Sequence, residues 1–199
     1  MRKALFLDRD GILNKVVIRE GVVSSPRSLD EFEINEDART LIRSGKRAGY
    51  AVVVVTNQPD VERNLFDTRT LEQMHDKLRT AFGIEFIQVC TSTNDSDPRR
   101  KPNPGMLLDA ARELQIDLGQ SLFVGDGKRD LAAGRGAGVT TILLKTSYNI
   151  EEHTLADHAV DSLNDVPLHF RSEGGQVCNL PRAIFNRPAR WLDKLMPQK

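Results

Sequence analysis

The sequence predicts a doubly wound α/β fold, in which helices cover both faces of a mostly parallel, five-stranded sheet. Two observations support this prediction. Several strand-like runs are apolar almost without interruption, and helical stretches with recognisable ends alternate with them. A continuous apolar pattern indicates a strand that is buried on both faces, as in a parallel sheet. The alternation of strands with helices indicates right-handed crossovers between parallel strands.

The expected strands are rich in β-branched and apolar residues. They span residues 3–8 (KALFLD), 50–56 (YAVVVVT), 84–90 (IEFIQVC), 121–125 (SLFVG) and 139–145 (VTTILLK). Helices are expected in the stretches 35–49, 67–83 and 103–116. Gly49 and Gly83 can end the first two of these helices, and Pro104 can stand near the first position of the third.

Composition excludes several classes of protein. A length of 199 residues suits one domain with a substantial core. The 28 basic residues balance the 28 acidic ones, so net charge gives no reason to expect a nucleic acid or a membrane surface as a partner. Cys90 and Cys178 stand in unlike contexts, and the chain shows neither a secretory leader nor an apolar run long enough to span a membrane. These features predict a cytoplasmic protein.

The character of the chain changes near residue 170. We therefore expect a domain over residues 1–170, followed at 171–199 by a linker (RSEGGQ) and a basic, amphipathic C-terminal appendage. The last stretch, from Val177 onward, holds five basic residues and one acidic residue. Three interpretations of the appendage are open: it docks on its own domain, forms a dimer contact, or meets a membrane or an anionic partner. We expect a monomer or a weak homodimer.

Polar clusters follow four of the expected strands at or just beyond their carboxyl ends. They are DRDG (8–11), TNQ (56–58), RRKPNPG (99–105) and GDGKRD (125–130). Each alone has an ordinary structural explanation, as a turn, a helix-capping loop or a solvated basic loop. In open α/β sheets, however, sites form beyond the carboxyl ends of strands. Together the clusters predict a single site with carboxylates, cations and a hydroxyl–amide pair.

The chemistry of that site follows from its residue types. Asp8, Asp10 and Asp126 offer hard oxygen ligands of the kind that Mg²⁺ takes, and a cation would relieve the repulsion between them. Asp8 can attack phosphorus to give an aspartyl phosphate. Asp10 projects to the same side of an extended chain, where it can protonate the leaving oxygen and later deprotonate water. Lys101 and the hydroxyl of Thr56, with the neighbouring amide of Asn57, would hold the phosphoryl oxygens.

With these clusters in this order, residues 4–145 resemble the haloacid dehalogenase superfamily of phosphatases, whose fold is Rossmann-like. The resemblance implies that Asp8 is the nucleophile and Asp10 the general acid and base. It also implies that Asp126, with the backbone carbonyl of Asp10, completes the magnesium shell. Asp130 would be a supporting carboxylate near the metal.

A narrower likeness rests on FLDRDGILN, VVTNQPDV, RKPNPGML and FVGDGKRDLAAGRGAGV. These are similar to the capless branch that contains D-glycero-D-manno-heptose 1,7-bisphosphate 7-phosphatases and the histidinol-phosphate phosphatase domain. The likeness implies removal of the 7-phosphate of a heptose 1,7-bisphosphate and a substrate contact for Arg100. The intervals between the motifs are each filled by a helix and a strand, which leaves no room for a cap domain. The loops 14–34 and 59–67 are then expected to contact the substrate.

One departure from that branch concerns zinc. Relatives commonly carry a structural zinc in the loop before Arg-Lys-Pro, with four Cys or His ligands. Here Cys90 could be the first ligand, but Ser92, Asp97 and Arg99 occupy the other places. One thiolate and one carboxylate do not make a tetrahedral zinc site, so no structural zinc is expected.

Other functions stay open at this point. The substrate could be histidinol phosphate, another sugar phosphate or a polynucleotide 3′-phosphate. The net charge of zero argues against the polynucleotide, because proteins that bind nucleic acids usually carry a basic surface. A degenerate module that binds a sugar phosphate or a protein is the non-enzyme alternative. His75, on the second expected helix, is expected to be solvated.

Overall fold

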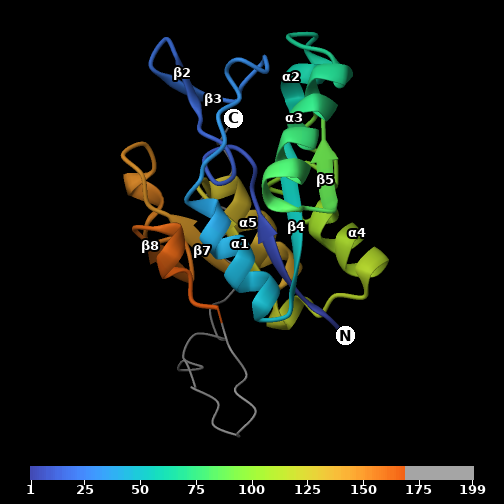
Figure 1. Ribbon diagram of the computed structural model, residues 1–199, viewed down its shortest axis with the longest axis vertical. Helices are drawn as coiled ribbons and strands as arrows, with labels where there is room; N and C mark the ends of the chain where they lie inside the picture. The colour runs from blue at the N-terminus through green and yellow to red at the C-terminus, as the bar shows by residue number, and fades with distance from the viewer. Residues whose placement is uncertain (169–199) are drawn as a thin grey trace, which may run out of the picture. The chain divides into compact units, whose positions relative to one another are not determined.

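Six parallel strands form the central sheet of the computed structural model, which describes residues 1–168 (Figure 1). The strand order is β5-β4-β1-β6-β7-β8. The strands are β1 (Lys3–Leu7), β4 (Tyr50–Asn57), β5 (Phe86–Cys90), β6 (Leu122–Gly125), β7 (Thr140–Leu144) and β8 (His158–Val160). The parallel α/β architecture predicted from the apolar runs is confirmed.

The predicted number of strands was one too few. The additional strand, β8, pairs in parallel with β7, with Leu144 opposite Val160. It has three residues at the edge of the sheet, and only Val160 among them is buried. A strand this short has no continuous apolar run, so the pattern that revealed the other strands could not reveal this one.

Helices cover both faces of the sheet, as predicted. Alternate residues of β1 point to opposite faces. Leu5 and Leu7 belong to a core that includes buried side chains of α1 (Ala38–Arg47) and α3 (Thr68–Phe82). Ala4 and Phe6 belong to the opposite core, with side chains of α4 (Gly105–Leu114) and α5 (Lys128–Ala137). The two cores fix the sheet between the helix layers.

The order of the strands reverses direction at β1. The chain passes from β1 to β4 and β5 on one side, then returns to β6, β7 and β8 on the other side. Such a reversal leaves a crevice at the carboxyl ends of the central strands, because the connections on either side diverge there. The polar clusters that follow β1, β4 and β6 therefore meet at one place.

Two small elements lie in the expected substrate-contacting loops. Strands β2 (Val17–Arg19) and β3 (Val22–Ser24) form an antiparallel hairpin within residues 14–34. The short helix α2 (Pro59–Glu62) lies within residues 59–67. In Figure 1 the hairpin and α2 stand at the same end of the sheet. Between β1 and β4 the described chain holds only this hairpin, α1 and connecting loops.

The predicted appendage at 171–199 lies outside the described residues. None of the helices between residues 1 and 168 combines the length and the apolar character that a membrane crossing requires.

The prediction of a solvated His75 was wrong. Its side chain on α3 is 1% exposed, and Arg9, which is completely buried, lies nearby. Burial, followed by the charge of Arg9, lowers the pKa of His75 to about 4. Helical periodicity places His75 one position beyond the apolar stripe residue Met74, but it does not show how wide the buried face is.

Replacing His75 by Gln tests this burial. In the folded protein His75 takes up its proton only near pH 4, whereas its ordinary pKa is 6.5. The unfolded state therefore binds more protons between these values, so the wild-type free energy of unfolding falls as the pH drops through this window. Relative to wild type, His75→Gln should gain up to about 3 kcal/mol between about pH 7 and pH 4 in urea denaturation. A stability difference that does not change with pH would contradict this expectation.

Candidate active site

A cavity of about 380 Å³ opens at the carboxyl ends of β1 and β6. Its lining residues come from the clusters that follow β1, β4, β5 and β6, from the loop 14–34 that was expected to contact the substrate, and from the loop after β7, which the sequence did not single out. They include Asp8, Asp10, Asn57, Lys101, Asp126 and Asp130, with Ser25 from the hairpin side and Tyr148 from the loop after β7. The structure thus brings most of the predicted site residues together.

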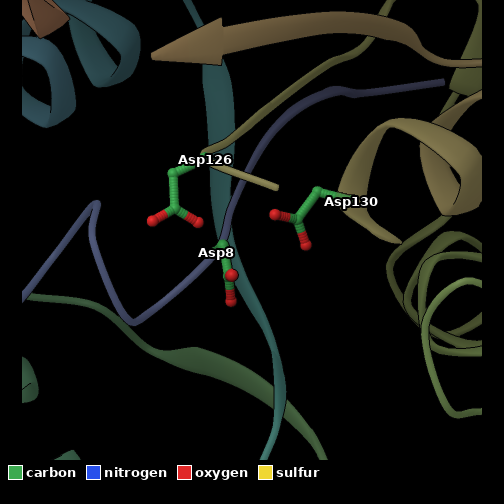
Figure 2. Close-up of side chains that lie close together, drawn as sticks. All are labelled: Asp8, Asp126 and Asp130. Carbon is green, nitrogen blue, oxygen red and sulfur yellow. The ribbon is translucent and has the colours of Figure 1, made fainter. Parts of the chain in front are cut away.

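Three carboxylates form an acidic cluster in this cavity. Asp8 follows β1, Asp126 follows β6, and Asp130 lies in the first turn of α5. One oxygen of each lies within 4.8 Å of the others (Figure 2). Burial and then repulsion by Asp130 raise the pKa of Asp8 well above its usual value, and the same two causes raise the pKa of Asp126 to about 7. The cluster therefore lacks positive charge.

Lys101 supplies one positive charge to this cluster. Its buried ammonium Nζ lies 2.8 Å from Asp8 Oδ1 and 2.7 Å from Asp130 Oδ1, and it donates to the carbonyl of Val55 at 2.8 Å. Burial by itself lowers the pKa of Lys101, but Asp130 and Asp8 together raise it above its usual value. One ammonium faces three carboxylates, so the donor set fits a hard divalent cation, which would balance the remaining charge.

Asp10 lies beside this cluster, and its carboxylate is bound by other donors. It accepts hydrogen bonds from Arg9 Nη2 at 3.0 Å and from Asn14 Nδ2 at 2.9 Å. Ser25 Oγ and Gln58 Nε2 each donate to it at 2.8 Å. Burial raises the pKa of Asp10, but Arg9 and these hydrogen bonds outweigh burial and lower it.

The acidic cluster thus differs from the predicted set of metal-binding side chains. Asp130, expected only as support, contributes a carboxylate to the cluster, and Asp10 does not. The backbone carbonyl of Asp10 stays a predicted ligand.

Thr56 and Asn57 stand at the end of β4. The hydroxyl Oγ1 of Thr56 is buried and accepts from Gln58 Nε2 at 2.8 Å. Asn57 holds the backbone of Lys101 from both sides: its Oδ1 accepts from the Lys101 amide at 3.0 Å, and its Nδ2 donates to the Lys101 carbonyl at 2.9 Å. Asn57 therefore positions Lys101, and its predicted contact with phosphate stays a prediction.

Arg100 is set back from the cavity. Its side chain is 7% exposed, with Nε 2.9 Å from Asp95 Oδ1 and Nη1 2.7 Å from the carbonyl of Ser92. Among the described residues that line the cavity, Lys101 is present and Arg100 is not. Its predicted substrate contact stays a prediction.

Several residues of the site escaped the sequence analysis. Tyr148 donates its hydroxyl to Asp126 Oδ2 at 2.5 Å, and Asn149 donates to the carbonyl of Asp126 at 2.8 Å. Gly11 has a φ of +80°, and a Cβ there would lie 1.9 Å from Asp126 Oδ2, so the close approach requires glycine. Tyr148 and Asn149 follow the last predicted strand, and applying the strand-end rule to that strand would have found them.

The chain matches known proteins along most of its length. The sequence profile of haloacid dehalogenase-like hydrolases matches residues 4–138. The D-glycero-beta-D-manno-heptose-1,7-bisphosphate 7-phosphatase of Pasteurella multocida is 34% identical over 182 residues, covering 84% of this chain and 96% of that protein. The D-glycero-alpha-D-manno-heptose-1,7-bisphosphate 7-phosphatase of Burkholderia mallei is also 34% identical, covering 71% and 79% of the two chains.

A solved structure shares the fold. It is the D,D-heptose 1,7-bisphosphate phosphatase of B. bronchiseptica complexed with magnesium and phosphate, which is 32% identical. The match has a TM-score of 0.70 and covers 81% of this chain and 93% of that one.

Replacing Asp126 by Asn tests the charge imbalance of the acidic cluster. Without metal, folded Asp126 holds its proton up to about pH 7, whereas its ordinary pKa is 3.8. The folded state binds more protons in this window, so the wild-type free energy of unfolding should fall by about 2 to 4 kcal/mol as the pH rises from about 4 to about 7. Asp126→Asn should show a smaller fall than the wild type when unfolding is measured in EDTA, because the contribution of Asp126 is gone while that of Asp8, whose pKa is also raised, remains.

Magnesium provides the second half of the test. Millimolar Mg²⁺ should raise the melting temperature of the wild type more than that of Asp126→Asn, because binding to the folded state stabilises it. Asp37→Asn, at an exposed carboxyl at the start of α1 that makes no side-chain capping bond, is the matched control. Equal responses of Asp126→Asn and the control would contradict a role for Asp126 in cation binding.

Proposed function

The chain belongs to the haloacid dehalogenase-like hydrolase family, and we propose that it removes the 7-phosphate of a heptose 1,7-bisphosphate through an aspartyl-phosphate intermediate. The observation that carries the proposal is the buried cluster of Asp8, Lys101 and Asp130, which opens on the cavity at the end of β1. The substrate is inferred from relatives at about a third identity, whose names specify this activity.

Asp8 is the proposed nucleophile. Its Oδ1 accepts hydrogen bonds from Lys101 Nζ and from the Arg9 amide, the latter at 2.6 Å. These contacts fix the carboxylate against the end of β1 and leave its second oxygen for attack. A bond forms between that oxygen and phosphorus, and the bond between phosphorus and the sugar oxygen breaks. Lys101 stays charged and stabilises the negative charge that shifts over the phosphoryl oxygens.

Asp10 is the proposed general acid and base. It would give a proton to the departing sugar oxygen, then take one from the water that attacks the aspartyl phosphate, which releases phosphate and restores Asp8. Arg9, Asn14 and Gln58 favour the ionised form of Asp10 in the free protein, which is the form needed for the second step. The first step requires that Asp10 take up a proton after the substrate displaces some of these donors.

The residues fit a magnesium ion as cofactor. Asp8 and Asp126 would hold it, with Asp130 nearby, since their oxygens converge and carry excess negative charge. When bound, Mg²⁺ supplies positive charge that keeps Asp8 ionised and offsets the charge of the phosphoryl group. Tyr148 and Asn149 hold Asp126 in place for this role.

Replacing Asp8 by Asn tests the mechanism. The amide cannot form the phosphoryl intermediate, so phosphate release should fall by at least about a thousandfold. The fold should persist, because Asn has almost the same shape and reduces the crowding of negative charge. Phosphate release and melting temperature are measured together, with Asp37→Asn as the control. Asp8→Asn with normal turnover would refute the proposed nucleophile.

A substrate panel tests the specificity. Phosphate release is measured with the α and β anomers of D-glycero-D-manno-heptose 1,7-bisphosphate, fructose 1,6-bisphosphate, histidinol phosphate and a 3′-phosphorylated oligonucleotide, each with Mg²⁺ and with EDTA. We expect a heptose bisphosphate to have the highest kcat/KM by at least about tenfold, and only with Mg²⁺. A higher value for histidinol phosphate or the oligonucleotide would replace the proposed substrate while leaving the phosphatase chemistry intact.

A further inference from the structure

A second group of cations lies at the edge of the cavity, next to the acidic cluster. Lys128 and Arg129 occupy the first two positions of α5, immediately before Asp130, and both line the cavity. Arg100, in the loop after β5, is linked to Arg129 because both side chains contact the carboxylate of Asp95. These cations are separate from Lys101, whose ammonium is enclosed between Asp8 and Asp130.

Arg129 is the exposed member of this group that is also held in place. Its Nη1 lies 3.0 Å from Asp95 Oδ1 and 3.2 Å from the carbonyl of Lys101. The side chain is nevertheless 46% exposed. Within the described part of the chain, the polar contacts of its guanidinium run through Nη1. The other nitrogens keep their donors for a ligand in the cavity.

Asp95 does not neutralise this group. Its Oδ1 accepts from both Arg100 Nε and Arg129 Nη1, so one carboxylate serves two guanidinium groups. Hydrogen bonds from Arg100 and then from Arg129 lower the pKa of Asp95, which keeps it ionised and able to hold both. Lys128 adds a further positive charge at the same edge, part of which is offset by Glu152, a lining residue that interacts with Lys128. The cavity is therefore acidic around Asp8 and basic around Arg129.

Arg100 is less suited than Arg129 to receive a ligand. It is 7% exposed, and its donors are engaged by Asp95 and the carbonyl of Ser92. Burial of this kind fixes a side chain but leaves little of it for a ligand. Arg129, half-exposed and anchored at one nitrogen, offers the preorganised fork that binds phosphate oxygens in pairs.

We propose that Arg129 binds the second phosphate group of a bisphosphate substrate, and that Asp95 is the positioning residue that orients it. The inference rests on the proposed function, because that function supplies a substrate with two phosphates. The reacting phosphate lies at the acidic cluster with its cation, and the second phosphate lies at the basic edge of the same cavity. Arg129 then determines specificity for bisphosphates over monophosphates.

The experiment compares kcat/KM for matched pairs of substrates in the presence of Mg²⁺. The pairs are heptose 1,7-bisphosphate with heptose 7-phosphate, and fructose 1,6-bisphosphate with fructose 6-phosphate. Arg129→Gln removes the positive charge. Asp95→Asn keeps that charge but removes the carboxylate that holds the Arg129 side chain in place. Arg112→Gln, which removes a guanidinium that is 80% exposed on α4, is the matched control.

We expect the ratio of kcat/KM for the bisphosphate to that for the monophosphate to fall by about tenfold or more in Arg129→Gln, mainly through KM. Asp95→Asn should lower the ratio in the same direction by a smaller factor, and Arg112→Gln should leave it unchanged. Arg129→Lys, which keeps the charge but loses the planar fork, should fall between wild type and Arg129→Gln.

The outcomes separate this inference from the proposed function. If the wild type prefers fructose 1,6-bisphosphate over both heptose compounds and Arg129→Gln abolishes that preference, the heptose substrate is wrong and the second-phosphate site stands. If Arg129→Gln changes both members of every pair equally, Arg129 has no role in binding a second phosphate. If the wild type shows no preference for bisphosphates in either pair, the inference is overturned even where the phosphatase activity is confirmed.

Discussion

The ammonium of Lys101, buried between Asp8 and Asp130, is the interaction on which the rest of the site depends. Burying an ion pair costs desolvation energy that the attraction between the charges only partly returns, so this contact adds little to stability. It does allow two carboxylates to approach each other at the end of a buried strand. Removing the lysine would leave those charges uncompensated, and such losses cost about 3–5 kcal/mol in other proteins.

The fold is arranged so that this ammonium reaches its partners. β1 carries Asp8 to the point where the strand order reverses, and α5 places Asp130 on the neighbouring side. Val55, on β4, accepts from the Lys101 ammonium through its carbonyl, and Asn57 at the end of the same strand holds the lysine backbone. The segment with Lys101 comes from the loop after β5, which is held by Arg99 through its contacts with Asp109 and Gln88. Two strands, one helix and one loop thus hold the Lys101 ammonium in place.

The sequence showed the existence of this site but not its internal arrangement. Strand ends are visible as the points where apolar runs meet Asp, Asn or Lys, and the topology of a parallel sheet brings those ends together. Which carboxylates converge depends on side-chain directions. Asp10 and Asp8 are two residues apart, yet Gly11 turns the chain after Asp10, and Arg9 binds the Asp10 carboxylate beside the cluster.

Other features of the structure could not be predicted from the sequence, for different physical reasons. The burial of Arg9 requires a pocket made by side chains far away in sequence, including Phe32, whose ring centroid lies 5.5 Å from the guanidinium carbon. The hydrogen bond between Tyr148 and Asp126 depends on how the loop after β7 returns over the cavity. The edge strand β8 forms by pairing with β7, and its own three residues carry no apolar pattern that predicts a strand. Such contacts follow from the packed structure and leave no periodic signal in the chain.

The network around Asp10 connects this residue to the two segments that are expected to contact the substrate. Ser25, just beyond β3, donates to Asp10, and Arg27 in the same segment lies 2.7 Å from Asp60 on α2. A ligand that enters beside the hairpin and hydrogen-bonds to Ser25 would compete with Asp10, the proposed general acid and base, for this donor. Losing the Ser25 hydrogen bond would raise the pKa of Asp10, because that bond favours the ionised form. Entry of the substrate would in this way move Asp10 toward the protonated state that the departing sugar oxygen needs.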